Sequence, residues 1–315
     1  MKAIQIKDFG GPEVMELVEV PDPDADDGHV VVDVARAGVN FADTHAIAND
    51  YLAEQSLPLI PGGEVSGRTP DGRRVAAMLG NGGYAEKVAV PESWLVPVPD
   101  EVDDDQAAAL LIQGTTAHAL LHHCAHVREG ETVVIEAAAG GTGSLAVQLA
   151  KRAGAKVIAL ASSDEKRGLA ERLGADASAD SRAADLTEAI LEANGGDKVD
   201  VVLHMSGTGF GAELKALDSL GRIVVFGNAG RQPNDLKTNY LLQTSKSVIG
   251  FWIVPFIVKR REELAGAIGE LLGAVAKGEI EIVIGGVYPL SEAARAHEDI
   301  AQRRSSGKLL LDPAS

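Results

Sequence analysis

The most informative chemical feature of the chain is a glycine-rich turn between an apolar strand and a helix. Residues 137–143 read AAAGGTG; they follow the β-branched run 132–135 and lead into an Ala- and Leu-rich segment at 143–153. Glycine at 140 lets the backbone approach a pyrophosphate, and glycine at 143 lets the helix pack closely on the strand. The helix start adds N–H groups and a positive dipole end. This context predicts dinucleotide binding; the alternative is a packing turn that binds nothing.

The end of the next strand indicates which nicotinamide cofactor binds. An acidic residue there would hold the ribose hydroxyls of NAD. The strand at 156–160 instead continues into Ser162 and Ser163, with Lys166 and Arg167 just beyond. A small pocket with nearby cations suits the extra phosphate of NADPH, so the sequence favours NADPH over NADH. Asp164 is also close, and one interpretation is that it caps the following helix.

The elements that must position this turn alternate along the middle of the chain. Such alternation of strand and helix predicts a doubly wound parallel sheet with helices on both faces, a Rossmann domain in an α/β fold. The first hundred residues are instead rich in proline and in short apolar runs, which predicts a β-rich, barrel-like unit. The expected strands lie at 132–135, 156–160, 199–203 and 222–226, and expected helices at 106–127, 143–153, 164–173, 264–276 and 291–302.

Composition excludes several classes of function. The 315 residues suggest two domains, and 46 acidic against 29 basic residues give a net charge of −17. Such acidity argues against nucleic-acid and anionic-membrane partners. Cys124 is the single cysteine, which excludes an intrachain disulfide and a cysteine-based zinc cluster. The start of the chain does not resemble a signal peptide, and the apolar run at 248–258 is too short to span a bilayer. We therefore expect a cytoplasmic protein.

Several motifs together resemble one known family. They are AGVNFADT at 37–44, PGGEVSG at 61–67, GGYAE at 82–86, TTA at 115–117 and the glycine turn, followed near the C-terminus by AHE at 296–298 and GK at 307–308. With this set, which spans nearly the whole chain, the sequence resembles the medium-chain dehydrogenase/reductase superfamily. Within that superfamily it is most similar to the zinc-independent quinone oxidoreductases, the zeta-crystallin-like branch.

The resemblance implies a split fold and a type of reaction. A GroES-like catalytic domain would comprise residues 1–113 and 255–315, around a Rossmann domain at 114–254. The cofactor would bind in the cleft between the domains, and two chains would form a homodimer through the strand near 247–252. Zinc-using relatives carry a cysteine near Asn40 and a histidine in a Gly-His-Glu unit, whereas this chain has Gly63 before Glu64. The resemblance thus implies hydride transfer from NADPH to a quinone without zinc.

The family's site residues transfer to this sequence position by position. The catalytic candidates are Asn40, His45 and Tyr51. The family often has tyrosine at position 45, so a histidine there is either a proton donor to the reduced oxygen or a residue that lines the pocket. The implied cofactor contacts are Asn40, Thr116, Gly140, Gly141, Thr142, Gly143, Ser162, Lys166, Gly227, Asn228, Ala229, Phe251, Arg303 and Lys308.

Two alternatives to quinone reduction remain open at this point. One is an enoyl or 2-alkenal reductase on the same scaffold, with an α,β-unsaturated carbonyl as substrate. The other is a non-catalytic NADPH-binding sensor or structural protein. A separate feature is the spacing of His118, His122 and His126, which would share one face of a helix. We interpret it as a histidine-rich exposed face and predict no metal there, although two histidines four residues apart can bind one.

Overall fold

The chain divides into two units in a computed structural model that describes residues 1–25, 28–50 and 52–315. Unit 1 comprises residues 1–112 and 269–315, and unit 2 comprises residues 113–268. The sequence placed the second boundary after residue 254, whereas the grouping of the structure places it inside a helix. Within the described ranges, every helix is too short or too polar to cross a membrane.

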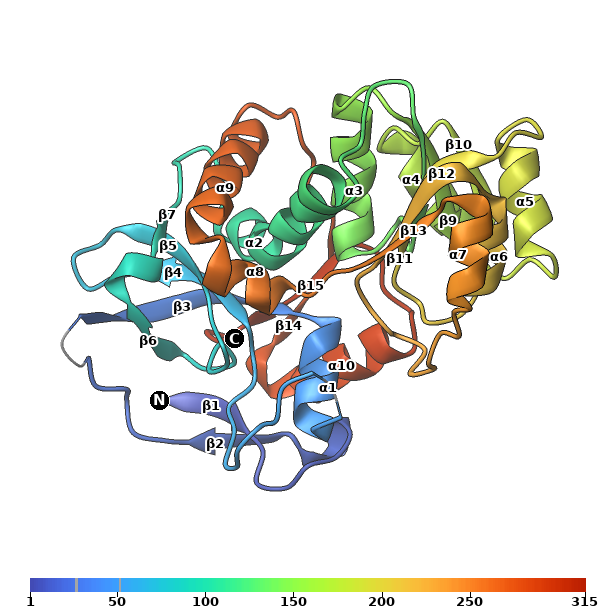
Figure 1. Cartoon of the computed structure of the whole chain (residues 1–315). Coiled ribbons are helices and arrows are strands. Elements are labelled where there is room, and N and C mark those ends of the chain that lie inside the picture. The colour runs from blue at the N-terminus through green and yellow to red at the C-terminus, as the bar shows by residue number, and fades with distance from the viewer. Residues whose placement is uncertain (26–27, 51) are drawn as a thin grey trace. The chain divides into compact units, whose positions relative to one another are not determined.

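Unit 1 is built on a seven-stranded sheet that pairs strands of the first hundred residues with the last strand of the chain (Figure 1). The order is β14-β15-β3-β4-β5-β7, with β6 also paired to β3. The C-terminal strand β15 runs antiparallel to β3, with Leu309 opposite Val39 and Leu311 opposite Ala37. The strands are β3 (His29–Val39), β4 (Glu64–Arg68), β5 (Arg74–Met78), β6 (Lys87–Pro91), β7 (Val96–Pro97), β14 (Ile284–Pro289) and β15 (Lys308–Asp312), beside a separate ribbon of β1 (Lys2–Gln5) and β2 (Glu16–Glu19).

The core of unit 1 follows from the alternation of side chains along these strands. Val32, Val34, Val65 and Val75 point to one buried cluster, together with Leu309 from the C-terminal strand. Helix α1 (Phe41–Ala48) begins directly after β3, where the Asp43 carboxylate accepts a hydrogen bond from the Asn40 N–H at 2.8 Å. This cap fixes where the chain turns from strand to helix. Helix α10 (Ala293–Ala301) buries Ala293 and Ala296 in the same cluster.

Unit 2 contains the predicted parallel sheet, in the order β10-β9-β8-β11-β12-β13. The chain runs outward from β8 to β10 and then resumes on the other side of β8 with β11, so the topological switch point lies between β8 and β11. The strands are β8 (Thr132–Glu136), β9 (Lys156–Ala161), β10 (Ala177–Asp180), β11 (Val199–His204), β12 (Leu217–Val225) and β13 (Ser247–Gly250). Helices α3 (Gly141–Arg152), α4 (Asp164–Arg172), α5 (Leu186–Ala193), α6 (Phe210–Ala216) and α7 (Thr238–Thr244) accompany them.

The histidine-rich segment departs from the single helix expected over 106–127. Helix α2 (Asp104–Ala119) widens into a π-helical turn at Leu120–Cys124 and then ends. His126 lies beyond it with a left-handed φ of 47°. The prediction of a three-histidine stripe was therefore wrong for His126, because the wide turn and the helix end remove it from the helical face. The rings of His118 and His122 do lie together, with centroids 4.5 Å apart.

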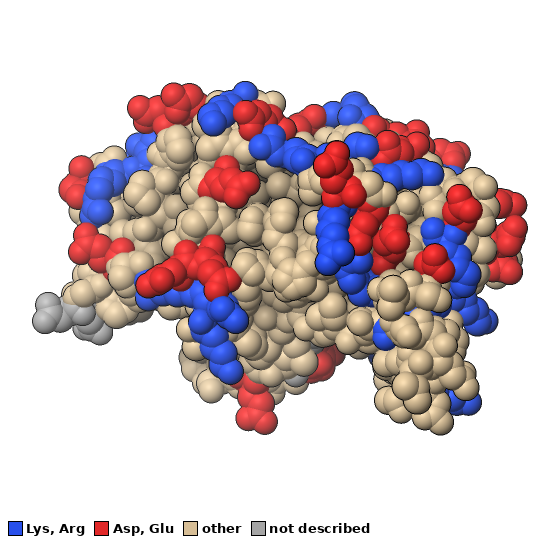
Figure 2. Space-filling view, turned by 45° about the horizontal axis from the view of Figure 1, so that its top comes forward, with Lys and Arg blue, Asp and Glu red and all other residues tan. Residues whose placement is uncertain are grey.

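The remaining helical segments are α8 (Ile253–Lys259), the 16-residue α9 (Arg261–Ala276) and short 3₁₀ turns at Pro12–Val14, Glu92–Trp94 and Leu290–Glu292. On the face drawn in Figure 2, lysines and arginines lie among aspartates and glutamates rather than in one basic field.

Candidate functional site

The glycine turn has a geometry that only glycine satisfies at one position. Ala137 follows β8 with φ 48°, and Gly140 caps the start of α3 in an extended conformation. A Cβ atom on Gly143 would lie 2.1 Å from the Ala137 carbonyl oxygen, whereas one on Gly140 would lie 3.2 Å from it. Gly143 therefore allows α3 to pack against the end of β8. The N–H groups in the first turn of α3 have no intrahelical acceptor, so they form a donor cradle suited to phosphate oxygens.

The end of β9 carries no acidic residue at positions 161–163. Ser163 caps α4, because its Oγ accepts a hydrogen bond from the Lys166 N–H at 3.3 Å. The interpretation of Asp164 as the cap was wrong: it lies in the first turn of α4 and pairs with Arg167. Arg167 also donates to the Ala161 carbonyl at 3.2 Å. Ser162 and Lys166 are both half-buried beside this strand end.

Other predicted cofactor contacts of unit 2 lie at the same edge of the sheet. Gly227, Asn228 and Ala229 follow β12, and Phe251 follows β13. Because all six strands are parallel, these loops emerge at the edge from which the glycine turn also emerges. The Ala229 N–H donates to the Met205 carbonyl at 3.1 Å, which ties this loop to the end of β11. Thr116 is a buried residue of α2.

A buried ion pair holds Asn40 in unit 1. The Lys308 ammonium lies 2.5 Å from Glu64 Oε1 and 2.8 Å from Asn40 Oδ1. The Asn40 amide nitrogen donates to the same Glu64 oxygen at 3.1 Å, and the Ile112 N–H donates to the other oxygen at 2.8 Å. Lys308 is 3% exposed and Glu64 is fully buried. Lys308, a predicted cofactor contact, thus binds Asn40 and Glu64 inside the protein. Arg303, another predicted contact, is exposed on the surface of the same unit.

A second buried chain of hydrogen bonds adjoins this ion pair through Asp43. The Tyr84 hydroxyl lies 2.9 Å from Asp43 Oδ2 and 3.0 Å from His297 Nε2. Burial raises the pKa of Asp43 to about 6 and lowers the pKa of His297 to about 4. The sequence analysis missed Glu64, Tyr84 and His297 as members of one network. Their motifs were visible, but their convergence depends on strand pairing across the chain.

His45 forms a pair with a carboxylate. Its Nδ1 lies 2.7 Å from Asp50 Oδ1, and its buried ring packs edge-on to Phe41. A carboxylate at one ring nitrogen fixes the ring orientation and favours a proton on that nitrogen. The third catalytic candidate, Tyr51, lies outside the described residues.

Two family models match the chain. The model described as an alcohol dehydrogenase GroES-like domain matches residues 26–100, and that of a zinc-binding dehydrogenase matches residues 141–272. The chain is 34% identical to a quinone oxidoreductase of Rattus norvegicus, over 98% of this chain and 96% of the relative.

Two solved structures share both the fold and a named cofactor. The quinone oxidoreductase of Thermus thermophilus, also solved in complex with NADPH, is 37% identical with a TM-score of 0.89, over 99% of this chain and all of that chain. The Escherichia coli quinone oxidoreductase in complex with NADPH is 31% identical with a TM-score of 0.93, over the same shares.

The residues around Asn40 do not fit the catalytic zinc that the second family description suggests. Gly63 offers no side chain, and Asn40 stands where zinc-using relatives have cysteine. The Lys308 ammonium already neutralises the nearby Glu64 carboxylate. A dication would meet that ammonium instead of a set of thiolate and imidazole ligands. The chemistry of this site must therefore proceed without a zinc ion at Asn40.

Proposed function

The chain belongs to the zinc-independent quinone oxidoreductase branch of the medium-chain dehydrogenase/reductase superfamily, and on that premise we propose that it is an NADPH-dependent enzyme that reduces a quinone. The observation that carries the proposal is the donor cradle at the start of α3, which the Gly143 contact holds against β8. The cradle would bind the pyrophosphate of the cofactor through residues 140–143. Ser162 and Lys166 would hold the adenosine phosphate, in a strand end without a carboxylate.

The class of hydride acceptor follows from the residues around Asn40, which do not fit a zinc ion that could polarise a carbonyl group. Bound NADPH supplies a hydride, which carries two electrons and one proton equivalent. A quinone is electrophilic enough to accept that hydride directly, and it needs one further proton to become a hydroquinone. We assign that proton to Nε2 of the protonated His45 ring, whose Nδ1–H is held by Asp50. Asn40, which Lys308 and Glu64 hold in place, would donate or accept a hydrogen bond at cofactor or substrate.

The function is tested by NADPH oxidation with the purified, chelator-treated protein. A simple quinone and an α,β-unsaturated aldehyde are compared at equal concentrations, with products identified in each case. We expect faster oxidation with the quinone and a hydroquinone product. Activity with the aldehyde alone would instead make the protein an enoyl or alkenal reductase. NADPH binding without turnover of either acceptor would favour a sensor or structural role.

The proton-donor role of His45 has its own test. We expect His45→Gln to lower kcat for the quinone by about 10²-fold or more, because general acid catalysis contributes that much or more. Asp50→Asn should give a smaller loss and shift the pH profile of kcat, because Asp50 acts only through the ring. NADPH-induced thermal stabilisation should be unchanged in both variants. If His45→Gln retains the rate and the pH profile, His45 only lines the pocket.

We also propose a homodimer in the cytoplasm. Strand β13 is the edge of the six-stranded sheet, and an edge strand offers unpaired backbone groups to a second copy. Leu242 and Val258, on the neighbouring helices α7 and α8, are 82% and 72% exposed. Light scattering after size exclusion should report a dimer, and Ile249→Pro in β13 should convert it to monomers. A wild-type monomer at micromolar concentration would contradict the dimer.

A further inference from the structure

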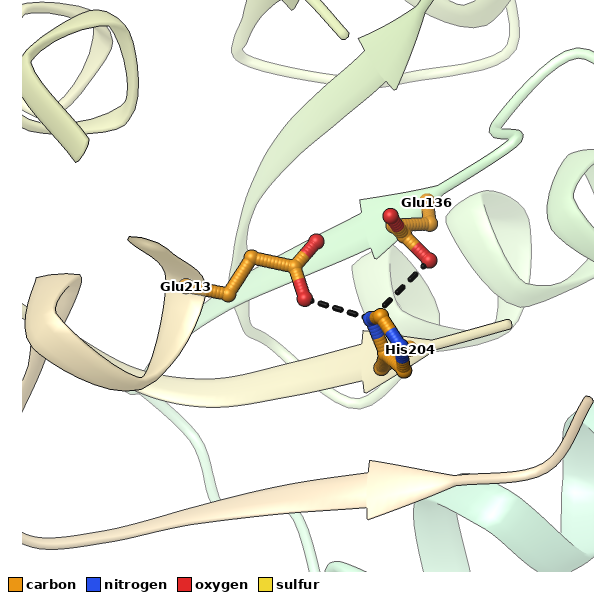
Figure 3. A group of neighbouring side chains, drawn as sticks. All are labelled: Glu136, His204 and Glu213. Atoms are coloured by element: carbon orange, nitrogen blue, oxygen red, sulfur yellow. Dashed lines mark hydrogen bonds and ion pairs between the residues drawn. The ribbon is translucent and has the colours of Figure 1, made fainter. Parts of the chain in front are cut away.

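Three side chains that can bind metals converge at the switch point of the unit 2 sheet (Figure 3). Glu136 ends β8, His204 ends the adjacent strand β11, and Glu213 lies on α6. His204 Nδ1 is 2.6 Å from Glu213 Oε2 and 3.2 Å from Glu136 Oε2. One ligand atom from each residue lies within 4.8 Å of the other two, and all three residues are buried. Among the described residues, this is the single group of three or more side chains with that property.

In the part of the chain that the structure describes, Glu136 and Glu213 pair with His204 and with no lysine or arginine. Both oxygens of Glu136 have hydrogen-bond donors: Oε2 accepts from the Met205 and Ser206 N–H groups at 2.6 and 2.8 Å, and Oε1 accepts from the Ser206 hydroxyl at 2.8 Å. In Glu213, by contrast, Oε1 is buried without a hydrogen-bond partner. Burial and the neighbouring Glu136 raise the pKa of Glu213 well above its usual value.

We propose that Glu136, His204 and Glu213 form a binding site for a divalent metal ion of the zinc class. One imidazole nitrogen and two carboxylate oxygens are donor types that Zn²⁺ accepts in proteins. A dication would neutralise the two carboxylates and would give Glu213 Oε1 the partner that it lacks. The site is in the nucleotide-binding unit, so it is distinct from the Asn40 position and goes beyond the proposed function.

Two of the ligand separations can be compared with those of a zinc site. Ligand atoms around a tetrahedral zinc ion lie about 3.3 Å apart, which follows from bonds of about 2.0–2.1 Å. The 3.2 Å separation of His204 from Glu136 already fits, and the 2.6 Å separation from Glu213 must open. Metal binding requires the imidazole proton to move from Nδ1 to Nε2, because the Nδ1 lone pair becomes the ligand, and any proton on Glu213 leaves to solvent.

Outer contacts for such an ion lie close by. Asn234 Nδ2 is 3.2 Å from His204 Nε2, and a flip of this amide would turn its oxygen to the ring, where it would accept the Nε2 proton. Ser206 and the two backbone N–H groups orient Glu136. An ion there would join the ends of β8 and β11 to α6. Because Ala137 directly follows Glu136, the ion would also brace the strand from which the glycine turn begins.

The experiment measures zinc binding by the untagged full chain. His118→Gln/His122→Gln serves as the background, because these two neighbouring imidazoles could bind zinc independently. After chelator treatment, one equivalent of Zn²⁺ is titrated while thermal unfolding and the metal content after dialysis are recorded. In this background we compare Glu213→Gln with Glu188→Gln, an exposed glutamate of α5. The Glu213→Gln change keeps the size of the side chain and an oxygen for the His204 N–H, so folding should survive.

We expect one bound zinc ion per chain and a rise in Tm of about 5 °C at saturating zinc. Glu213→Gln should weaken binding by about 100-fold or more and abolish the Tm shift, whereas Glu188→Gln should retain both. Equal zinc binding in the two variants would place the ion elsewhere and overturn the proposal. No bound zinc, with Glu213→Gln as stable as its background, would also overturn it and identify the cluster as a shared-proton network.

Discussion

The glycine turn of unit 2 and the buried polar network of unit 1 are built in opposite ways. The turn uses consecutive residues, 137–143, and presents backbone N–H groups. The network joins side chains from β4, α1, α10 and β15, which are far apart in the chain: Lys308 and Asn40 are separated by 268 residues. The turn therefore depends on steric fit at one position. The network depends on opposite charges that neutralise one another, so the protonation of each side chain depends on its neighbours.

The comparison predicts that removing one charge should harm the protein more than adding one methyl group. Lys308→Met would leave the fully buried Glu64 carboxylate without its cation. We expect a loss of about 3–5 kcal/mol in the free energy of unfolding, measured by urea denaturation. The double variant Glu64→Gln/Lys308→Met should recover most of that loss, because the remaining pair is neutral. A small loss in the single variant would mean that charge compensation does not govern this network.

Steric fit in the turn is tested by two glycines of unit 2. Gly143→Ala would place a methyl group 2.1 Å from the Ala137 carbonyl oxygen, so α3 must move away from β8. We expect about 3 kcal/mol of destabilisation and loss of NADPH-induced thermal stabilisation. Gly168→Ala in α4 is the control: nothing lies within 4 Å of its added methyl, so stability should rise by up to about 1 kcal/mol. Equal effects of the two substitutions would remove the steric argument.

Asp43 and His297 should change the stability of the protein in opposite directions as pH rises. The folded-state pKa of Asp43 is raised from 3.8 to about 6, so its contribution to stability falls as pH rises through that window. The folded-state pKa of His297 is lowered from 6.5 to about 4, so its contribution rises with pH over nearly the same window. The two contributions largely cancel in the wild-type protein.

Single variants should separate these two contributions. We compare the free energy of unfolding of wild type with that of each variant as pH rises from 4 to 7. The difference between wild type and Asp43→Asn should fall by about 2–3 kcal/mol, and the difference between wild type and His297→Gln should rise by a similar amount. Urea denaturation at several pH values measures both differences. Parallel pH curves for all three proteins would show that burial does not shift either group.

The smallest expected effect is on cofactor affinity and comes from one side chain, Lys166, beside the glycine turn. If Lys166 binds the adenosine phosphate, Lys166→Ala should weaken NADPH binding by about tenfold and leave NADH binding unchanged, because one charge-assisted contact is lost. Titration calorimetry with both cofactors measures the ratio. Arg172→Ala, farther along α4, is the matched control. Equal losses for NADPH and NADH would remove the phosphate-reading role of Lys166.

Local patterns were sufficient to predict the parallel sheet and the turn. Strands at 132–135, 156–160 and 199–203 were found within about a residue of their ends, since buried parallel strands are continuous apolar runs. The turn was predictable because its glycines, strand and helix are neighbours in sequence. The histidine face was predicted less well, because a regular helical period does not reveal a π-helical turn.

What the sequence determined by itself was the chemistry that the backbone performs: a strand, a glycine turn and a helix whose N–H groups can bind phosphate. Only the tertiary structure decided the partners of the buried charged groups. It is the pairing of β15 with β3 that brings Lys308 to Asn40 and Glu64, and the pairing of β11 with β8 that brings His204 to Glu136. The physical reason is that buried ionisable groups are stabilised by specific neighbours, and sheet register sets those neighbours regardless of distance along the chain.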